Sequence, residues 1–174
     1  MEMNPNDFLG SLGYLALGSR LKRAGTLLQT ATQNWLQAAG CDVPAAHMPL
    51  LAALDRAGSV SLGTVVDMLG VAQPGVSRMA DSLQAAGWIT VTTDLADKRV
   101  RILALTPAGQ TLVAEAKVSL WPVVQAAVGE LCTGLTGPFA AQLSDLERKL
   151  SAGAFERALA GNGTKSGNRR HVVA

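Results

Sequence analysis

The feature that most constrains the fold is a change of hydrophobic period between residues 61 and 106. From Leu62 to Leu83 apolar residues recur at spacings of three and four, which predicts helices that pack through one face. Residues 88–93 and 99–106 instead alternate and are rich in β-branched side chains, which predicts two strands. The order is therefore a short helix, a tight turn, a second helix and a two-stranded hairpin.

Small polar residues and glycines mark where these elements begin and end. Ser59 and Ser61 are suited to cap a short helix that ends at Gly70, and the next helix is predicted from Gln73 to Gly87. Thr106 is placed to cap the helix that follows the hairpin. Two helices joined by a short turn, with a hairpin directly behind them, predict a winged helix-turn-helix.

Longer helices are predicted on both sides of this unit. Residues 8–39 carry apolar side chains at helical spacing up to Gly40, a helix of about 30 residues that four internal glycines could break. A second helix is predicted over residues 107–131, with a kink at Pro122. A last helix carries the apolar stripe Leu143, Leu146 and Leu150. The fold class is thus mainly α with a small β-hairpin.

The overall charge excludes few classes of partner, because its excess lies in the tail. The chain has 15 Lys+Arg against 13 Asp+Glu, a net charge of +2. Without Lys165, Arg169 and Arg170 the count is 12 against 13, so the rest of the chain is nearly neutral. Residues 161–174 are predicted to form a disordered basic tail. The hydrophobic content of the whole chain, 48%, predicts a packed protein.

Few residues suggest catalysis or metal binding. Cys41 and Cys132 are far apart, and Asp42 beside the first disfavours a reactive thiolate, so a thiol redox sensor is only an alternative. His47 and His171 have no partners at metal-ligand spacing, and no GxSxG, P-loop or HExxH motif is present. We expect a non-enzymatic protein without metal or cofactor. With neither a signal peptide nor an apolar run of membrane-spanning length, we expect it in the cytoplasm.

The helix predicted from Gln73 has one face free of the core. The residues expected to point inward are Val76, Met79, Ala80 and Leu83. Those expected to point outward are Gln73, Ser77, Arg78 and Asp81. Glutamine and arginine side chains suit the edges of adenine and guanine, so this face is predicted to read the major groove of DNA.

The hairpin tip carries the densest basic cluster outside the tail. Lys98, Arg99 and Arg101 fall within four residues, and arginine on such a tip suits a narrow minor groove. Asp97 could hold the guanidinium of Arg99 through a bidentate ion pair. A winged helix used only for protein contacts is an alternative, but such a module has no need of three cations at its tip.

These residues resemble a known family. The wing motif consists of Asp97-Lys98-Arg99, Leu103, Leu105-Thr106-Pro107 and Gly109, and the helix-turn motif runs from Leu69 to Arg78. Both are similar to those of the MarR (multiple antibiotic resistance regulator) family, and the resemblance covers roughly residues 8–158. The segments Leu17–Arg23 and Leu120–Pro122 resemble a subgroup sometimes fused to an acetyltransferase domain, for which this chain has no room after residue 160.

The resemblance implies a homodimeric transcription factor, most simply a repressor, that binds an inverted repeat in double-stranded DNA. Residues 8–40 and 107–160 would form the dimerisation region, and residues 44–106 the DNA-binding lobe. The implied major-groove residues are Gln73, Pro74, Ser77 and Arg78. The implied wing residues are Asp97, Lys98, Arg99 and Arg101. Ala72 departs from the family pattern, since a capping serine is common there.

A small-molecule effector is also expected by this resemblance. It would bind where three predicted helices meet, those of residues 8–39, 44–58 and 107–131, and change the spacing of the two DNA-reading helices. The candidate residues are Arg20, His47, Met48 and Leu51.

Overall fold

The structure is a computed structural model that describes residues 8–133, 135–139, 141–143, 145 and 148. The chain divides into two units, residues 1–125 and 126–174, and the winged helix lies wholly in the first. In chain order the elements are α1 (Phe8–Ser11), η1 (Gly13–Ala16), α2 (Leu17–Ala38), η2 (Ala45–His47), α3 (Met48–Ala57), β1 (Val60–Ser61), α4 (Leu62–Leu69), α5 (Gln73–Ala85), β2 (Ile89–Thr93), β3 (Arg101–Leu105), α6 (Pro107–Glu115), η3 (Ala116–Leu120) and α7 (Trp121–Leu131).

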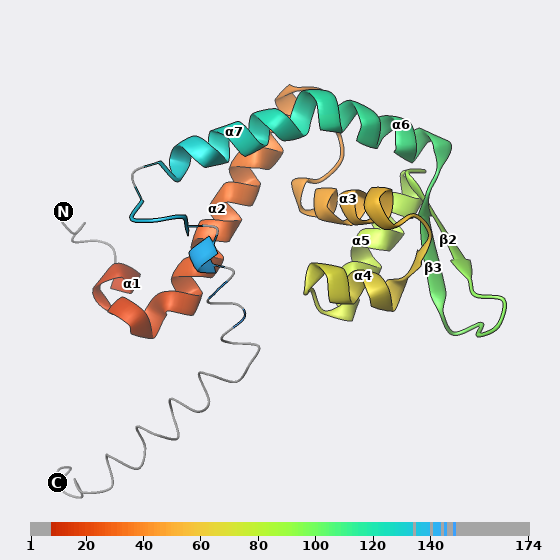
Figure 1. Ribbon diagram of the computed structural model, residues 1–174, viewed down its shortest axis with the longest axis horizontal. Helices are drawn as coiled ribbons and strands as arrows, with labels where there is room; N and C mark the ends of the chain where they lie inside the picture. The colour runs from red at the N-terminus through yellow and green to blue at the C-terminus, as the bar shows by residue number, and fades with distance from the viewer. Residues whose placement is uncertain (1–7, 134, 140, 144, 146–147, 149–174) are drawn as a thin grey trace, which may run out of the picture. The chain divides into compact units, whose positions relative to one another are not determined.

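The fold is mainly helical with one small sheet, as predicted. Figure 1 shows α3, α4 and α5 gathered beside the β2–β3 hairpin, whose connecting loop projects beyond the helices. No helix in the described ranges is long and apolar enough to cross a membrane.

The predicted N-terminal helix is broken near its start. Gly13 has a φ of +56°, in the left-handed region that a continuous right-handed helix excludes. The chain therefore forms the four-residue α1 and a 3₁₀ turn before the 22-residue α2, which is shorter than predicted. The predicted end is confirmed, because Gly40 follows with a φ of +78°.

The sheet has three antiparallel strands in the order β1-β3-β2. Its central residue is Leu103, which is paired with Val60 on one side and Val91 on the other. The two hairpin strands confirm the prediction. Strand β1 was not predicted, because it is two residues long and Ser61 within it also caps α4.

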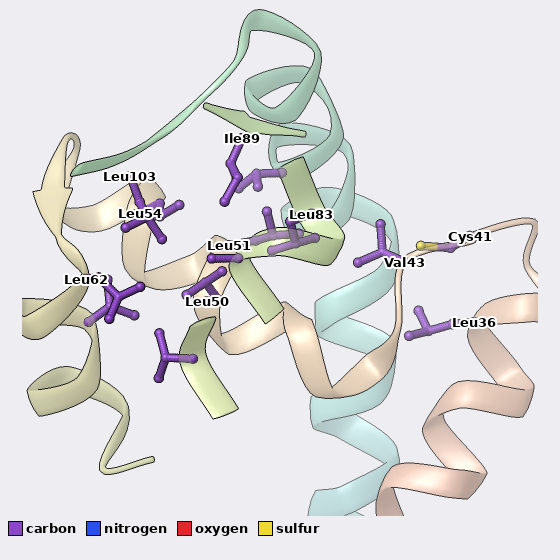
Figure 2. Packing of buried hydrophobic residues seen from close by; sticks show 14 residues of the cluster. Leu36, Cys41, Val43, Leu50, Leu51, Leu54, Leu62, Leu83, Ile89 and Leu103 are labelled. Atoms are coloured by element: carbon purple, nitrogen blue, oxygen red, sulfur yellow. The ribbon is translucent and has the colours of Figure 1, made fainter. Parts of the chain in front are cut away.

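The hydrophobic core lies among α3, α4, α5 and the sheet (Figure 2). Its most deeply buried side chains include Leu50, Leu51, Leu54, Leu83, Ile89 and Leu103. Each such side chain contributes about 1.5–3 kcal/mol when it leaves water. On β3 the residue that enters this core is Leu103, and its neighbours Ile102 and Ala104 face the other way because strand residues alternate.

The helix after the wing changes its hydrogen-bond pattern just before Pro122. Residues Ala116–Leu120 form a π-helical segment, and the Trp121 amide donates to the carbonyl of Ala116, five residues earlier. Proline has no N–H, and its ring clashes with the carbonyl four residues before it in a regular α-helix. The wider π-turn accommodates this proline, so the predicted disturbance is found immediately before it.

Part of the predicted C-terminal stripe cannot be compared with the structure. Leu143 is helical and half-buried. Leu146, Leu150 and the tail of residues 161–174 lie outside the described residues.

Candidate functional site

The turn between α4 and α5 is set by two helix caps. The Ser61 hydroxyl accepts a hydrogen bond from the Thr64 amide at 3.0 Å, so of the two predicted serines Ser61 is the N-cap of α4. Gly70 ends this helix in the left-handed conformation, with a φ of +61°, and its amide donates to the Val66 carbonyl at 2.9 Å. Helix α5 begins three residues later, so the turn is as tight as a helix-turn-helix requires.

Helix α5 starts without a side-chain cap. Ala72 occupies the N-cap, and its carbonyl accepts from the amides of Gly75 at 2.8 Å and Val76 at 3.3 Å. A Cβ on Gly75 would lie 3.0 Å from Cγ1 of Val71, so the glycine lets the turn pack closely. Pro74 lies in the first helical turn, where its missing N–H has no intrahelical partner.

The two faces of α5 divide as the sequence predicts. The buried residues are Val76, Ala80 and Leu83, and Met79 is half-buried against the core. The exposed residues are Gln73, Pro74, Arg78 and Asp81, and Ser77 is half-buried. The polar face of this helix is therefore available to a partner.

The wing loop is fastened by two aspartates. Asp94 Oδ1 accepts from the amides of Ala96 at 2.7 Å and Asp97 at 3.1 Å. Asp97 Oδ1 accepts from the amide of Arg99 at 2.9 Å. Two backbone bonds of 2.9 Å close the loop, from the Asp94 amide to the Val100 carbonyl and from the Val100 amide to the Asp97 carbonyl. The loop thus has its own hydrogen bonds before any partner binds.

Asp97 binds the backbone of Arg99 and not its guanidinium, with which the sequence predicts an ion pair. Its carboxylate holds the backbone amide of Arg99, and no ion pair between the two side chains is found in the part of the chain that the structure describes. The side chains of Lys98 and Arg99 are exposed. Asp97 therefore fixes the path of the loop and leaves both cations directed to solvent.

Arg101 is already engaged within the chain. Its Nη2 lies 2.5 Å from Oδ1 of Asp81, and its Nη1 donates to the Ser77 hydroxyl over a long 3.5 Å. Arg101 belongs to β3, whereas Asp81 and Ser77 belong to α5, so this side chain joins the wing to the helix. The sequence predicts Arg101 on the wing and Asp81 on the outward face of the helix, but not their ion pair. The signal for it is the acid Asp81 on a face expected to approach DNA.

A recess of about 230 Å³ lies where the wing meets the helix-turn-helix. Its lining residues are Ser61, Leu62, Gly63, Gln73, Ser77, Arg99, Val100 and Arg101. Four of the predicted site residues, Gln73, Ser77, Arg99 and Arg101, thus come together here. Pro74, Arg78, Asp97 and Lys98 lie outside this lining.

The four candidate effector residues differ in how deeply they are buried. Leu51 is fully buried in the core, Met48 is half-buried against it, and Arg20 is exposed on α2. Burial lowers the pKa of His47, and its Nδ1 is buried without a hydrogen-bond partner. The recess described above is lined by other residues.

The two cysteines differ in their surroundings. Cys41 is buried in the core, where it lacks the access that a sensing thiol needs, and Cys132 is half-exposed. No group of three potential metal ligands occurs within the described residues.

Comparison with known proteins shows a similarity to one family. Residues 42–100 match the MarR family model. A comparison with curated protein sequences finds no match. Among solved structures, BpsR of Bordetella bronchiseptica is 28% identical with a TM-score of 0.62, over 78% of this chain and 92% of that one. Its description concerns the regulation of DNA binding by 6-hydroxynicotinic acid.

Two further structures share the fold and were solved with DNA. A cysteine-to-serine mutant of MarR from E. coli, complexed with operator DNA, has a TM-score of 0.64 and 22% identity over 83% of this chain and 98% of that one. Overoxidised AbfR bound to DNA has a TM-score of 0.61 and 18% identity over 78% and 90%. The chain therefore shares the winged helix-turn-helix fold of these proteins, and its residues 42–100 are similar to the MarR family.

Proposed function

We propose that this protein regulates transcription by placing α5 in the major groove of operator DNA and the β2–β3 wing in the adjacent minor groove. One observation carries the proposal. The polar face of α5 and the basic wing border one recess, because Gln73, Ser77 and Arg99 all line it. Both DNA-reading elements therefore present their polar groups on the same side of the lobe.

The exposed residues of α5 have the chemistry for base edges. Gln73 suits adenine through its amide, and Arg78 suits guanine through its guanidinium fork. Ser77 is placed to reach a base or a phosphate, and Pro74 shapes the start of the helix where the groove floor would approach. Support comes from the division of faces on α5, which leaves these residues exposed or half-buried.

The wing supplies the minor-groove contact. Lys98 and Arg99 project from a loop whose path is set by Asp97, and a narrow minor groove attracts such cations. The DNA-bound structures of MarR and AbfR support this use of the shared fold.

The protein functions as a homodimer on an inverted repeat. Every residue of α2 from Gly18 to Ala31 is exposed in the single chain, including the apolar Leu21, Leu27 and Leu28. A helix with so much uncovered apolar surface is typical of a subunit interface. Residues 8–40 and 107–160 would form the dimerisation region, residues 44–106 the DNA-binding lobe, and 161–174 a basic tail.

A small molecule controls the DNA affinity, most simply as the inducer of a repressor. The effect of 6-hydroxynicotinic acid on BpsR supports ligand control in a relative. The site would include His47, whose buried Nδ1 is free to accept or donate a hydrogen bond, with Met48 beside it. Leu51 would support the site from the core and Arg20 would approach from α2. Binding would shift the population between spacings of the two α5 helices.

The proposal is tested by selecting duplexes from a random-sequence pool with the full-length protein. The expected result is an enriched inverted repeat with half-sites about one helical turn apart, protected as a unit in footprinting. The same repeat should occur in the fragment upstream of the protein's own gene. Failure to enrich any sequence above nonspecific binding would refute the function. A single protected half-site together with a monomer of 18.0 kDa in sedimentation would refute the dimer.

A further inference from the structure

An ion pair ties the wing to the recognition helix α5. Arg101 of β3 and Asp81 of α5 are 20 residues apart in sequence, yet their charged groups approach to 2.5 Å. The second guanidinium nitrogen of Arg101 reaches the Ser77 hydroxyl, also on α5. One arginine therefore spans two successive turns of the helix that faces DNA in the proposed function.

The pair is too exposed to matter much for the stability of the free protein. The side chains of Arg101 and Asp81 are 34% and 60% exposed, and such surface pairs contribute little to folding. Their position is more informative than their strength. Arg101 also lines the recess together with Gln73 and Arg99, so the pair lies between the two elements that would contact DNA.

The arrangement explains an acid on a DNA-reading face. An unpaired carboxylate at Asp81 would repel phosphates, and the guanidinium of Arg101 neutralises it. The same bonds occupy donors of Arg101 that a phosphate contact would need. Lys98 and Arg99, with exposed side chains, have no such partner in the ion pairs of the described residues.

We propose that Asp81 and Arg101 are a positioning pair that sets the spacing between the recognition helix and the wing, and that Arg101 is not a phosphate contact. This inference rests on the proposed function. Because the pair fixes the wing against α5 before binding, less conformational entropy is lost when the protein binds DNA. Specific binding needs both elements in register, whereas nonspecific attraction depends mainly on total charge.

The test compares two probes, the duplex most enriched from the random pool and an unrelated duplex of the same length. The variants are Asp81→Asn, Arg101→Ala, both together, and Asp81→Glu. Asp42→Asn and Arg56→Ala are the matched controls, because they make the same charge changes at exposed positions outside α5 and the wing. Circular dichroism establishes that each variant is folded.

If Asp81 and Arg101 act as a positioning pair, the losses of DNA affinity caused by their substitution should not be additive. Asp81→Asn and Arg101→Ala should each weaken binding to the enriched duplex about five- to tenfold beyond their charge controls, and the double variant should be no weaker than the worse single one. Affinity for the unrelated duplex should follow the controls. The salt slope of Arg101→Ala should match that of Arg56→Ala, and Asp81→Glu should recover most of the affinity.

Other results would overturn the inference in recognisable ways. A salt slope about 0.9 lower for Arg101→Ala, with tighter binding by Asp81→Asn, would make Arg101 a phosphate contact that Asp81 restrains. Additive losses, or no loss at all, would mean that the pair does not position the wing. If the wild-type protein enriches no duplex, the proposed function fails and the inference fails with it.

Discussion

Gly109 approaches the backbone of Trp88 so closely that a side chain cannot fit between them. A Cβ on Gly109 would lie 2.0 Å from the carbonyl oxygen of Trp88. That oxygen also accepts from the Thr106 amide at 3.1 Å, so it cannot move without breaking the junction between the sheet and α6. The first turn of α6 is thus locked against the start of β2.

Gly109→Ala should therefore destabilise the protein by about 1–3 kcal/mol, the usual cost of overpacking a rigid site. Urea unfolding followed by circular dichroism measures the change. Gly63→Ala is the matched control in the same lobe, because its Cβ would meet only Ser61 Oγ at an ordinary 3.7 Å. Equal stability of the two variants would contradict the close approach.

Adding a side-chain cap to α5 should stabilise this helix. Ala72 has φ −55° and ψ 140°, which serine adopts without strain, and no side chain caps α5. Ala72→Ser should raise the free energy of unfolding by about 1 kcal/mol, because its hydroxyl can accept from the Gly75 amide, which now has only the carbonyl of residue 72 as its acceptor. Ser61→Ala, which removes the observed cap of α4, should lower it by a similar amount. An unchanged midpoint for Ala72→Ser in urea would show that the new hydroxyl does not reach an amide.

The boundaries of the fold could be predicted because their chemistry is local. Thr106 shows this best. Its hydroxyl accepts from the Gly109 amide at 3.0 Å, as expected of an N-cap, and a threonine before a proline is visible in sequence alone. Gly70 likewise ends α4 at the predicted residue.

Features that depend on tertiary contacts could not be predicted in the same way. The partner of Arg101 depends on how β3 lies across α5. The spacing of Arg101 and Asp81 in the sequence does not predict the distance between their side chains. From the sequence, the carboxylate of Asp97 could bind either the amide or the guanidinium of Arg99. In the folded loop it accepts from the amide. Strand β1 exists only because Val60 meets Leu103 across the sheet.

Arg99→Ala should weaken DNA binding by a purely electrostatic loss. One phosphate contact fewer should lower the slope of log affinity against log salt by about 0.9, for the enriched duplex and for unrelated DNA alike. Arg56→Ala removes an exposed cation at the end of α3 and serves as the control. Fluorescence anisotropy over a range of salt concentrations measures both slopes. If the two variants have equal slopes, the wing does not contact the DNA backbone through Arg99.

The burial of His47 should make stability depend on pH. Desolvation lowers its pKa in the folded protein below the usual 6.5, so the unfolded chain binds more protons over the interval between the two values. The favourable contribution of the neutral His47 side chain to the free energy of unfolding is therefore fully present above about pH 6.5. It is lost as the pH falls through that interval.

Urea unfolding of wild type and His47→Gln between pH 5 and 8 measures this pH dependence. The wild type should lose more stability on acidification than His47→Gln, whereas His171→Gln, at the other histidine of the chain, should behave as the wild type does. Parallel pH profiles for wild type and His47→Gln would show that His47 is hydrated in solution and can be protonated without unfolding.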